Sequence, residues 1–125
     1  NLEGIATQTA TRPDGVSVAA GVVADVAQHN RTTGATGLGS VGVVIGATVA
    51  LADYGLTAAS LTDVPVLAPG FGHQGARIEQ LPELFGTAAQ NVVVSASRSI
   101  LSAGPSGIEA AIDTAAAEAG AACRA

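Results

Sequence analysis

The sequence predicts an α/β protein built around a parallel sheet. Three short apolar runs, residues 41–45, 64–68 and 92–95, alternate with stretches in which apolar residues recur every three or four positions. Short valine-rich runs are typical of buried strands, and the longer spacing is typical of amphipathic helices. Strands that alternate with helices form βαβ units, whose strands lie parallel in one sheet.

The N-terminal stretch predicts a turn-rich segment followed by a helix. Residues 1–15 are polar, and Pro13-Asp14-Gly15 is a turn signal. From Val16 to about Asn30 the apolar residues fall on one stripe, which comprises Val18, Ala19, Val22, Val23 and Val26. Asp14 is the expected N-cap. The glycines and threonines of residues 31–40 then predict a flexible loop.

The middle of the chain predicts two strands and two short helices. Residues 41–45 form a continuous apolar run, which is expected of a strand covered on both faces. A turn at residues 46–48 leads into a short helical segment at 49–54, and residues 56–62 remain ambiguous. The second strand, residues 64–68, precedes a glycine-rich loop. A helix at 78–85 should follow that loop and end at a C-capping glycine, Gly86.

The C-terminal part predicts the third strand and the last helix. Residues 97–103 suit one or two helical turns, which Gly104-Pro105 should break. Ser106 and Glu109 have the spacing of a capping box, so the last helix is expected from Gly107 to about Ala122. Its inward residues would be Ile108, Ala111, Ile112, Ala115 and Ala119.

The composition excludes several classes of function. All five basic residues are arginines, so a Schiff-base lysine, a P-loop lysine and a lysine general acid are absent from this chain. The net charge of −5 and the scattered arginines leave no basic face for nucleic acid. No apolar run approaches the length of a membrane span. Cys123 stands alone, which excludes an internal disulfide and suits an unreactive thiol in a cytoplasmic protein.

The sequence contains few candidate catalytic or metal-binding residues. It also predicts a modest hydrophobic core. No cluster of cysteine and histidine, no EF-hand spacing and no Ser/His/Asp set is evident. The aromatic residues are only Tyr54, Phe71 and Phe85. Since large rings normally supply much of a core's buried area, we expect this chain to pack against more protein.

Two loops indicate a site for one phosphate dianion. Pro69 to Gly75 follow the second strand, and Ser95 to Ser99 follow the third. Glycines leave backbone N–H groups accessible, and the start of a helix adds positive potential. Arg98 can pair two phosphate oxygens through its guanidinium, and Gln74 can donate from its amide. If the two strands are neighbours, both loops lie at one edge of the sheet.

Each candidate side chain also has a plain structural interpretation. Arg98 could equally be a surface arginine paired with a carboxylate, and Gln74 an exposed loop residue. His73 could carry a proton but more often such a residue has no chemical role. Thr48 ends the first strand at the same edge and could touch a ligand. His29 falls near a helix C-terminus and is assigned no function.

These motifs resemble the C-terminal half of orotidine 5′-phosphate decarboxylase, in its longer bacterial form. Residues 41–48 resemble the sixth strand of that barrel enzyme and the turn after it. The most specific matches are Val66-Leu67-Ala68-Pro69-Gly70-Phe71-Gly72-His73-Gln74-Gly75 for the seventh strand and its loop, and Val93-Val94-Ser95-Ala96-Ser97-Arg98-Ser99-Ile100-Leu101 for the eighth. The resemblance implies strands six to eight of a TIM (β/α)8 barrel over residues 1–125, incomplete without an N-terminal half. With 125 residues the chain is too short for a whole barrel, which takes about 250.

The resemblance also implies a role for the site residues. Gln74 and Arg98 would bind the substrate's phosphate together with the backbone at Ser97, where many relatives have glycine. Pro69 and Gly70 would line the pyrimidine end, and Gly75 would belong to the same substrate-binding loop. Asn1, in a segment that resembles the loop after the fifth strand, would lie beside a pyrimidine contact just outside this chain.

The family implied by this resemblance converts orotidine monophosphate to uridine monophosphate and carbon dioxide, without a metal or organic cofactor. Its catalytic Asp-x-Lys-x-x-Asp motif is absent here, so no catalytic residue is expected in this chain. The expected partners are the nucleotide, the N-terminal half of the barrel and, for the full enzyme, a second copy. Nucleic acid and membrane are not expected partners.

Two other functions remain open on the residues alone. The first is another phosphate-handling barrel lyase or isomerase, which would share the two loops. The second is a non-catalytic α/β module that binds a phosphorylated ligand. Such a module would keep a stable fold without a missing half.

Overall fold

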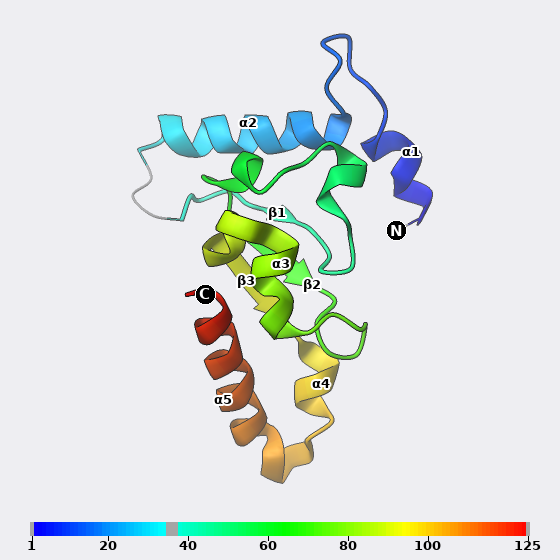
Figure 1. Cartoon of the computed structure of the whole chain (residues 1–125). Helices are drawn as coiled ribbons and strands as arrows, with labels where there is room; N and C mark the ends of the chain where they lie inside the picture. Colours follow the sequence, from blue (N-terminus) through cyan, green and yellow to red (C-terminus); the bar gives the residue numbers. More distant parts are fainter. Residues whose placement is uncertain (1, 35–37, 125) are drawn as a thin grey trace.

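The fold is a small parallel sheet with helices between its strands. The computed structural model describes residues 2–34 and 38–124. The strands β1 (Val43–Val44), β2 (Val66–Pro69) and β3 (Val92–Ser95) lie side by side in the order of the sequence, and both pairs are parallel. Figure 1 shows this sheet at the centre of the chain. The predicted α/β class and all three predicted strands are confirmed.

The helices differ greatly in length. Among the residues that the structure describes, two are long, α2 (Val18–Thr32) and α5 (Gly104–Ala122), and three are short, α1 (Ile5–Gln8), α3 (Leu81–Phe85) and α4 (Ser97–Leu101). In Figure 1, α2 lies along one end of the sheet, and α4 and α5 form a V at the other. Short 3-10 segments complete the connections, at Leu2–Gly4, Leu51–Tyr54, Ala59–Leu61, Ile78–Gln80 and Gly86–Asn91. Within the described ranges, no helix has both the length and the apolar character that crossing a bilayer requires.

The N-terminus of α2 corrects the predicted cap. Ser17, not Asp14, is the N-cap: its Oγ accepts a hydrogen bond from the Ala20 N–H at 3.0 Å. The same hydroxyl donates to the Tyr54 carbonyl at 2.6 Å, which joins α2 to the segment after β1. Asp14 instead accepts from the Val16 N–H within the preceding turn. The helix starts later than expected because residues 11 and 17 first pair in a short antiparallel bridge.

The start of α5 corrects a second expectation. The helix begins at Gly104, and its N-cap, Ala103, makes no side-chain capping hydrogen bond. Ser106 and Glu109 therefore lie inside the helix and form no capping box. The predicted break after residues 97–103 is confirmed, because α4 ends at Leu101 and a separate helix begins at Gly104. Proline is favoured in the first turn of a helix, where its missing N–H is not needed, so Pro105 fits the start of α5.

One face of the sheet carries the hydrophobic core. Val66 and Ala68 of β2 are fully buried, and Leu61, Leu81 and Phe85 pack on the same cluster. Phe71, directly after β2, is also buried. The predicted short helix at 78–85 is confirmed as a 3-10 turn followed by α3, and Gly86 ends it with a positive φ of 53°.

The opposite face of the sheet is bare. Val44, Leu67 and Val93 are 68%, 44% and 51% exposed, and they lie opposite one another in the strand register. The expectation that the first strand is covered on both faces is therefore wrong for the described residues. Successive strand residues point to opposite faces, and the described helices and turns pack on the face of Val66 and Ala68. We call Val44, Leu67 and Val93 the exposed row.

Candidate functional site

A small cavity lies where β2 and β3 end. Its volume is about 140 Å³, and its walls come from the two loops that follow these strands. The pairing of Pro69 with Ser95 at the ends of β2 and β3 brings the loops together. The lining residues are Pro69, Gly70, Phe71, His73, Gln74, Ser95, Ser97 and Arg98.

The loop after β2 needs glycine where it turns into the site. Gly70 has a φ of 115°, a conformation that residues with a side chain rarely adopt. A Cβ placed there would also lie 3.4 Å from the Ala47 backbone nitrogen and 3.5 Å from Gln74 Oε1. The Ala47 N–H donates to the Pro69 carbonyl at 2.7 Å. The end of β1, the turn at Gly70 and the Gln74 side chain are thus closely packed.

A ring of backbone hydrogen bonds fixes the shape of this loop. The Gly72 N–H donates to the Ala76 carbonyl at 2.8 Å, and the Ala76 N–H donates to the Gly70 carbonyl at 3.3 Å. The Gly75 N–H donates to the Gly72 carbonyl at 3.0 Å. Phe71 and Ala76 are buried at the base of the loop, whereas His73, Gln74 and Gly75 are exposed at its tip. Gln74 is therefore presented on a braced loop.

Arg98 is exposed on α4, directly after β3. Over residues 2–34 and 38–124, the ion pairs are Arg12 with Asp14 and Arg31 with Asp63, and none includes Arg98. The alternative in which Arg98 is a surface arginine paired with a carboxylate is therefore wrong for this part of the chain. Its guanidinium is free to bind a ligand that enters the cavity.

The charge of the cavity wall suits an anion. No aspartate or glutamate is among the described residues that line it. Its polar side chains are the Arg98 guanidinium, the Gln74 amide, the His73 imidazole and the hydroxyls of Ser95 and Ser97, all of which can donate hydrogen bonds. An oxyanion in this cavity would meet donors and one fixed positive charge, without a carboxylate to repel it.

The structure brings together five of the six residues predicted to bind substrate. Gln74, Arg98, Ser97, Pro69 and Gly70 line the one cavity, but Gly75 does not, because it lies at the loop tip with a φ of 105° and nothing within 4 Å of its side-chain direction. Thr48 is exposed and is also absent from this lining. Asn1 lies outside the described residues.

The predicted set of substrate-binding residues omitted three residues of the cavity wall. They are Phe71, His73 and Ser95. The signal for Ser95 is its place as the last residue of a strand, since ligands of parallel sheets bind at the carboxyl ends of strands. Phe71 could not be found in this way, because an aromatic residue after a strand is more often part of the core.

The described residues offer no metal-binding cluster, and the cysteine lies away from the cavity. No group of three histidine, cysteine, aspartate or glutamate side chains is close enough to hold a metal ion in residues 2–34 and 38–124. Cys123 is half-buried, and its thiol lies 3.5 Å from the Ala89 carbonyl, away from the cavity.

Comparison with known proteins identifies relatives of this chain. It is 45% identical over 106 residues to the orotidine 5′-phosphate decarboxylase of Streptomyces coelicolor and 43% identical over 105 residues to that of Salinispora tropica. Each match covers 84% of this chain. The chain is homologous to a part of the orotidine 5′-phosphate decarboxylases. No protein-family profile matches it.

A solved decarboxylase structure agrees with this assignment. A crystal structure from Streptomyces avermitilis, assigned as an orotidine 5′-phosphate decarboxylase, superposes on the whole chain with a TM-score of 0.85 and 43% sequence identity. The predicted resemblance to this family is confirmed. The chain spans only 36% of the length of the curated decarboxylases and 43% of the solved chain, so these relatives carry much sequence with no counterpart here.

Proposed function

We propose that this chain supplies the phosphate-binding part of an orotidine 5′-phosphate decarboxylase, a carboxy-lyase. The observation that carries the proposal is that Gln74 and Arg98 line one cavity that has no carboxylate among its described walls. The homologous decarboxylases are named for a substrate that carries a 5′-phosphate. A dianion at this place would receive a guanidinium fork from one loop and an amide donor from the other.

The proposed binding mode divides the site between two loops. Gln74 and Arg98 bind the phosphate, with the backbone at Ser97 as a further donor. Pro69 and Gly70, at the end of β2, form the side of the cavity toward the pyrimidine. Because charged hydrogen bonds contribute about 1.5–3 kcal/mol each, the phosphate contacts supply much of the affinity for the nucleotide.

Phosphate binding alone does not accomplish decarboxylation. Loss of carbon dioxide leaves a carbanion that must be protonated, and this chain contains no lysine to serve as the acid. We infer that the catalytic Asp/Lys network lies in sequence that the relatives have and this chain does not span. Binding energy from the remote phosphate is then used to hold the reacting pyrimidine against those groups.

We further propose that the sheet is a section of a TIM barrel, comprising its sixth to eighth strands. Three features support this proposal. The outer strands β1 and β3 each have one edge unpaired within the described residues. An apolar hollow of about 440 Å³, lined by Val22, Val43 and Val44 among others, borders β1. The exposed row covers the face that would point into a barrel.

The occupant proposed for these surfaces is the N-terminal part of the same enzyme. The relatives' extra length would provide the remaining strands. The complete enzyme would be a cytoplasmic homodimer whose chemistry uses no cofactor, as the family resemblance implies. A non-catalytic module is disfavoured by the bare apolar sheet face, since such a module would have to leave this face in water.

Calorimetric titration of an Arg98→Ala variant tests the proposal. The variant is made in the full-length gene product, and its affinity for uridine monophosphate and for uridine is compared with that of the unaltered protein. Loss of a charged hydrogen bond should weaken nucleotide binding roughly 10- to 150-fold and leave uridine binding within about twofold. Arg31→Ala is the matched control, because Arg31 pairs with Asp63 and neither residue lines the cavity.

If Arg98→Ala weakened binding of uridine monophosphate and of uridine equally, the proposal that Arg98 binds the phosphate would be wrong. A competition series with sugar phosphates adds a second criterion. If these bind as tightly as the pyrimidine nucleotide, the chain belongs instead to another phosphate-handling lyase or isomerase.

A further inference from the structure

The glycine-rich loop and the arginine-bearing helix meet at one close contact. A Cβ placed on Gly72 would lie 2.7 Å from Ser99 Oγ and 2.8 Å from Ser99 Cβ. Both distances are shorter than any ordinary contact, so the Ser99 side chain packs directly on the Gly72 backbone. Gly72 also has a φ of 73°, which favours glycine independently of space.

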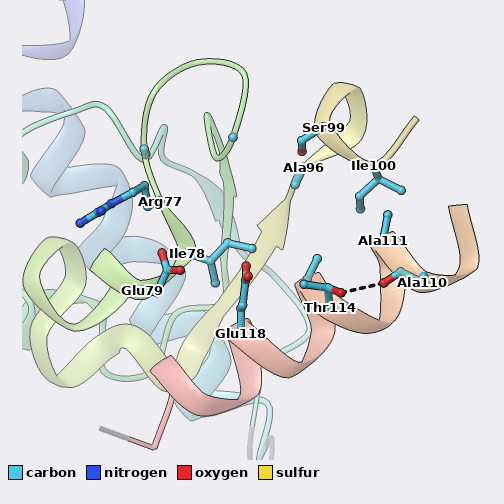
Figure 2. A pocket seen from close by; sticks show the side chains of 13 residues that line it. Arg77, Ile78, Glu79, Ala96, Ser99, Ile100, Ala110, Ala111, Thr114 and Glu118 are labelled. Carbon is cyan, nitrogen blue, oxygen red and sulfur yellow. Dashed lines mark hydrogen bonds between the residues drawn. The ribbon is translucent and has the colours of Figure 1, made fainter. Parts of the chain in front are cut away.

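The contact lies on the far side of the phosphate loops from the small cavity. Gly72 and Ser99 both line a larger, open pocket of about 490 Å³ between the loop, α4 and α5. Figure 2 shows Ser99 and Ala96 together at the α4 end of this pocket, with Thr114 and Glu118 of α5 on another wall. Ser99 therefore reaches the loop from behind, while Arg98, its neighbour in sequence, lines the small cavity.

Each partner in the contact is rigidly connected to a phosphate-binding side chain. On the loop, hydrogen bonds of Gly72 to Ala76 and Gly75 tie it into the backbone ring that presents Gln74. On α4, the Ser102 hydroxyl donates to the Ser99 carbonyl at 2.8 Å, and the Ser102 N–H donates to the Arg98 carbonyl at 3.0 Å. A shift at the contact would move Gln74 relative to Arg98.

We propose that Ser99, packed on Gly72, is a positioning residue that sets the spacing between Gln74 and Arg98. The inference rests on the proposed function, because it assumes that these two side chains share one phosphate. A dianion can be bound by both side chains only when they are held a fixed distance apart. The size of the side chains at positions 72 and 99 therefore controls how well the site distinguishes a nucleotide from its nucleoside.

The test uses substitutions that enlarge either side of the contact in the full-length gene product. Gly72→Ala introduces the Cβ that would collide with Ser99, and Ser99→Leu enlarges the other partner if the first variant does not fold. Each should weaken binding of uridine monophosphate roughly ten- to a hundredfold, since small misplacements of binding groups have effects of this size. Uridine binding should stay within about twofold, because uridine lacks the phosphate.

Two further variants separate the collision from backbone strain. Gly15→Ala carries the same strain, with a φ of 83° and nothing within 4 Å, in a turn outside the site. It should lower the unfolding temperature without changing the ratio of the two affinities. The double variant Gly72→Ala/Ser99→Gly gives the new Cβ room and should restore nucleotide binding to within about threefold of Ser99→Gly alone.

The outcomes distinguish this inference from the proposed function. If Arg98→Ala weakens nucleotide binding selectively but Gly72→Ala and Ser99→Leu do not, the positioning role is wrong and the phosphate site stands. A double variant no better than Gly72→Ala would also overturn the positioning role, since strain would then explain the loss. If Arg98→Ala shows no selectivity, the proposed function fails and this inference fails with it.

Discussion

Asn30 shows how a single buried amide connects three segments of this fold. Its side chain is 3% exposed and lies near the end of α2. The amide nitrogen donates to the carbonyls of Val41 at 2.8 Å and Asp63 at 2.9 Å, and its oxygen accepts from the Val41 N–H at 3.2 Å. The residues that precede β1 and β2 are thus fastened to the same helix.

We predict that Asn30→Ala lowers the free energy of unfolding by about 1–3 kcal/mol, because it leaves part-buried backbone groups of Val41 and Asp63 without partners. The measurement is denaturant unfolding of the full-length gene product. Gln28→Ala, on the exposed side of α2, is the control and should change stability by less than about 0.5 kcal/mol. If the two variants lose the same stability, the amide does not have this role.

Individual residues of the candidate site show what the sequence could and could not predict. Gln74 and Arg98 were predictable because each lies in a loop that follows an apolar run, and adjacent parallel strands bring their ends together. Gly75 was placed in the site by its position in the loop, but its φ and open surroundings put it at the tip. The contact of Ser99 with Gly72 joins residues 27 positions apart in sequence, and no local pattern encodes it.

Among the elements, strands were predicted better than helix starts. Valine-rich runs favour strands, and β2 and β3 appeared within about two residues of their expected bounds, whereas β1 covers only two residues of the run 41–45. The start of a helix depends on which of several nearby polar side chains accepts a hydrogen bond from the free N–H groups of its first turn. Ser17 replaced Asp14 through its bond to Tyr54, and α5 begins at Gly104, three residues before the expected start.

The exposed row on the three strands has the clearest consequence for how this sheet packs against other protein. Apolar side chains on adjacent strands form a continuous patch, and patches of this kind mark surfaces that pack against other protein. The sequence indicated burial of both faces from the unbroken apolar run. That pattern fits the complete barrel that we propose, whereas the described residues cover only one face of the sheet.

A charge in the exposed row should therefore affect the complete protein far more than its exposure here suggests. We predict that Leu67→Asp in the full-length gene product lowers the free energy of unfolding by about 3 kcal/mol or more, because it buries an unpaired carboxylate. Ile112→Asp replaces an apolar residue of similar exposure on α5, away from the row, and should cost less than about 1 kcal/mol. Chemical denaturation of both variants measures the difference.

Similar losses in the two variants would mean that the row faces solvent in the complete protein. In that case the sheet would not be a section of a closed barrel. The proposal for the phosphate site does not depend on this outcome, because the small cavity is formed entirely by the loops after β2 and β3.

For the whole molecule, the proposed function places phosphate recognition and bond-breaking chemistry in different parts of the polypeptide. At the small cavity, the described residues provide hydrogen-bond donors, the Arg98 guanidinium and a braced loop. They provide no lysine, and the relatives are more than twice as long as the part they share with this chain. The parallel architecture followed from strand alternation. The bare face of the sheet fits two earlier expectations, which came from the scarcity of aromatic side chains and from the family resemblance.

The most direct measurement is a crystal structure of the full-length gene product with uridine monophosphate. We expect the phosphate in the small cavity, with its oxygens about 2.7–3.2 Å from both the Gln74 amide nitrogen and the Arg98 guanidinium. A phosphate bound elsewhere, or one in this cavity that contacts neither side chain, would contradict the account.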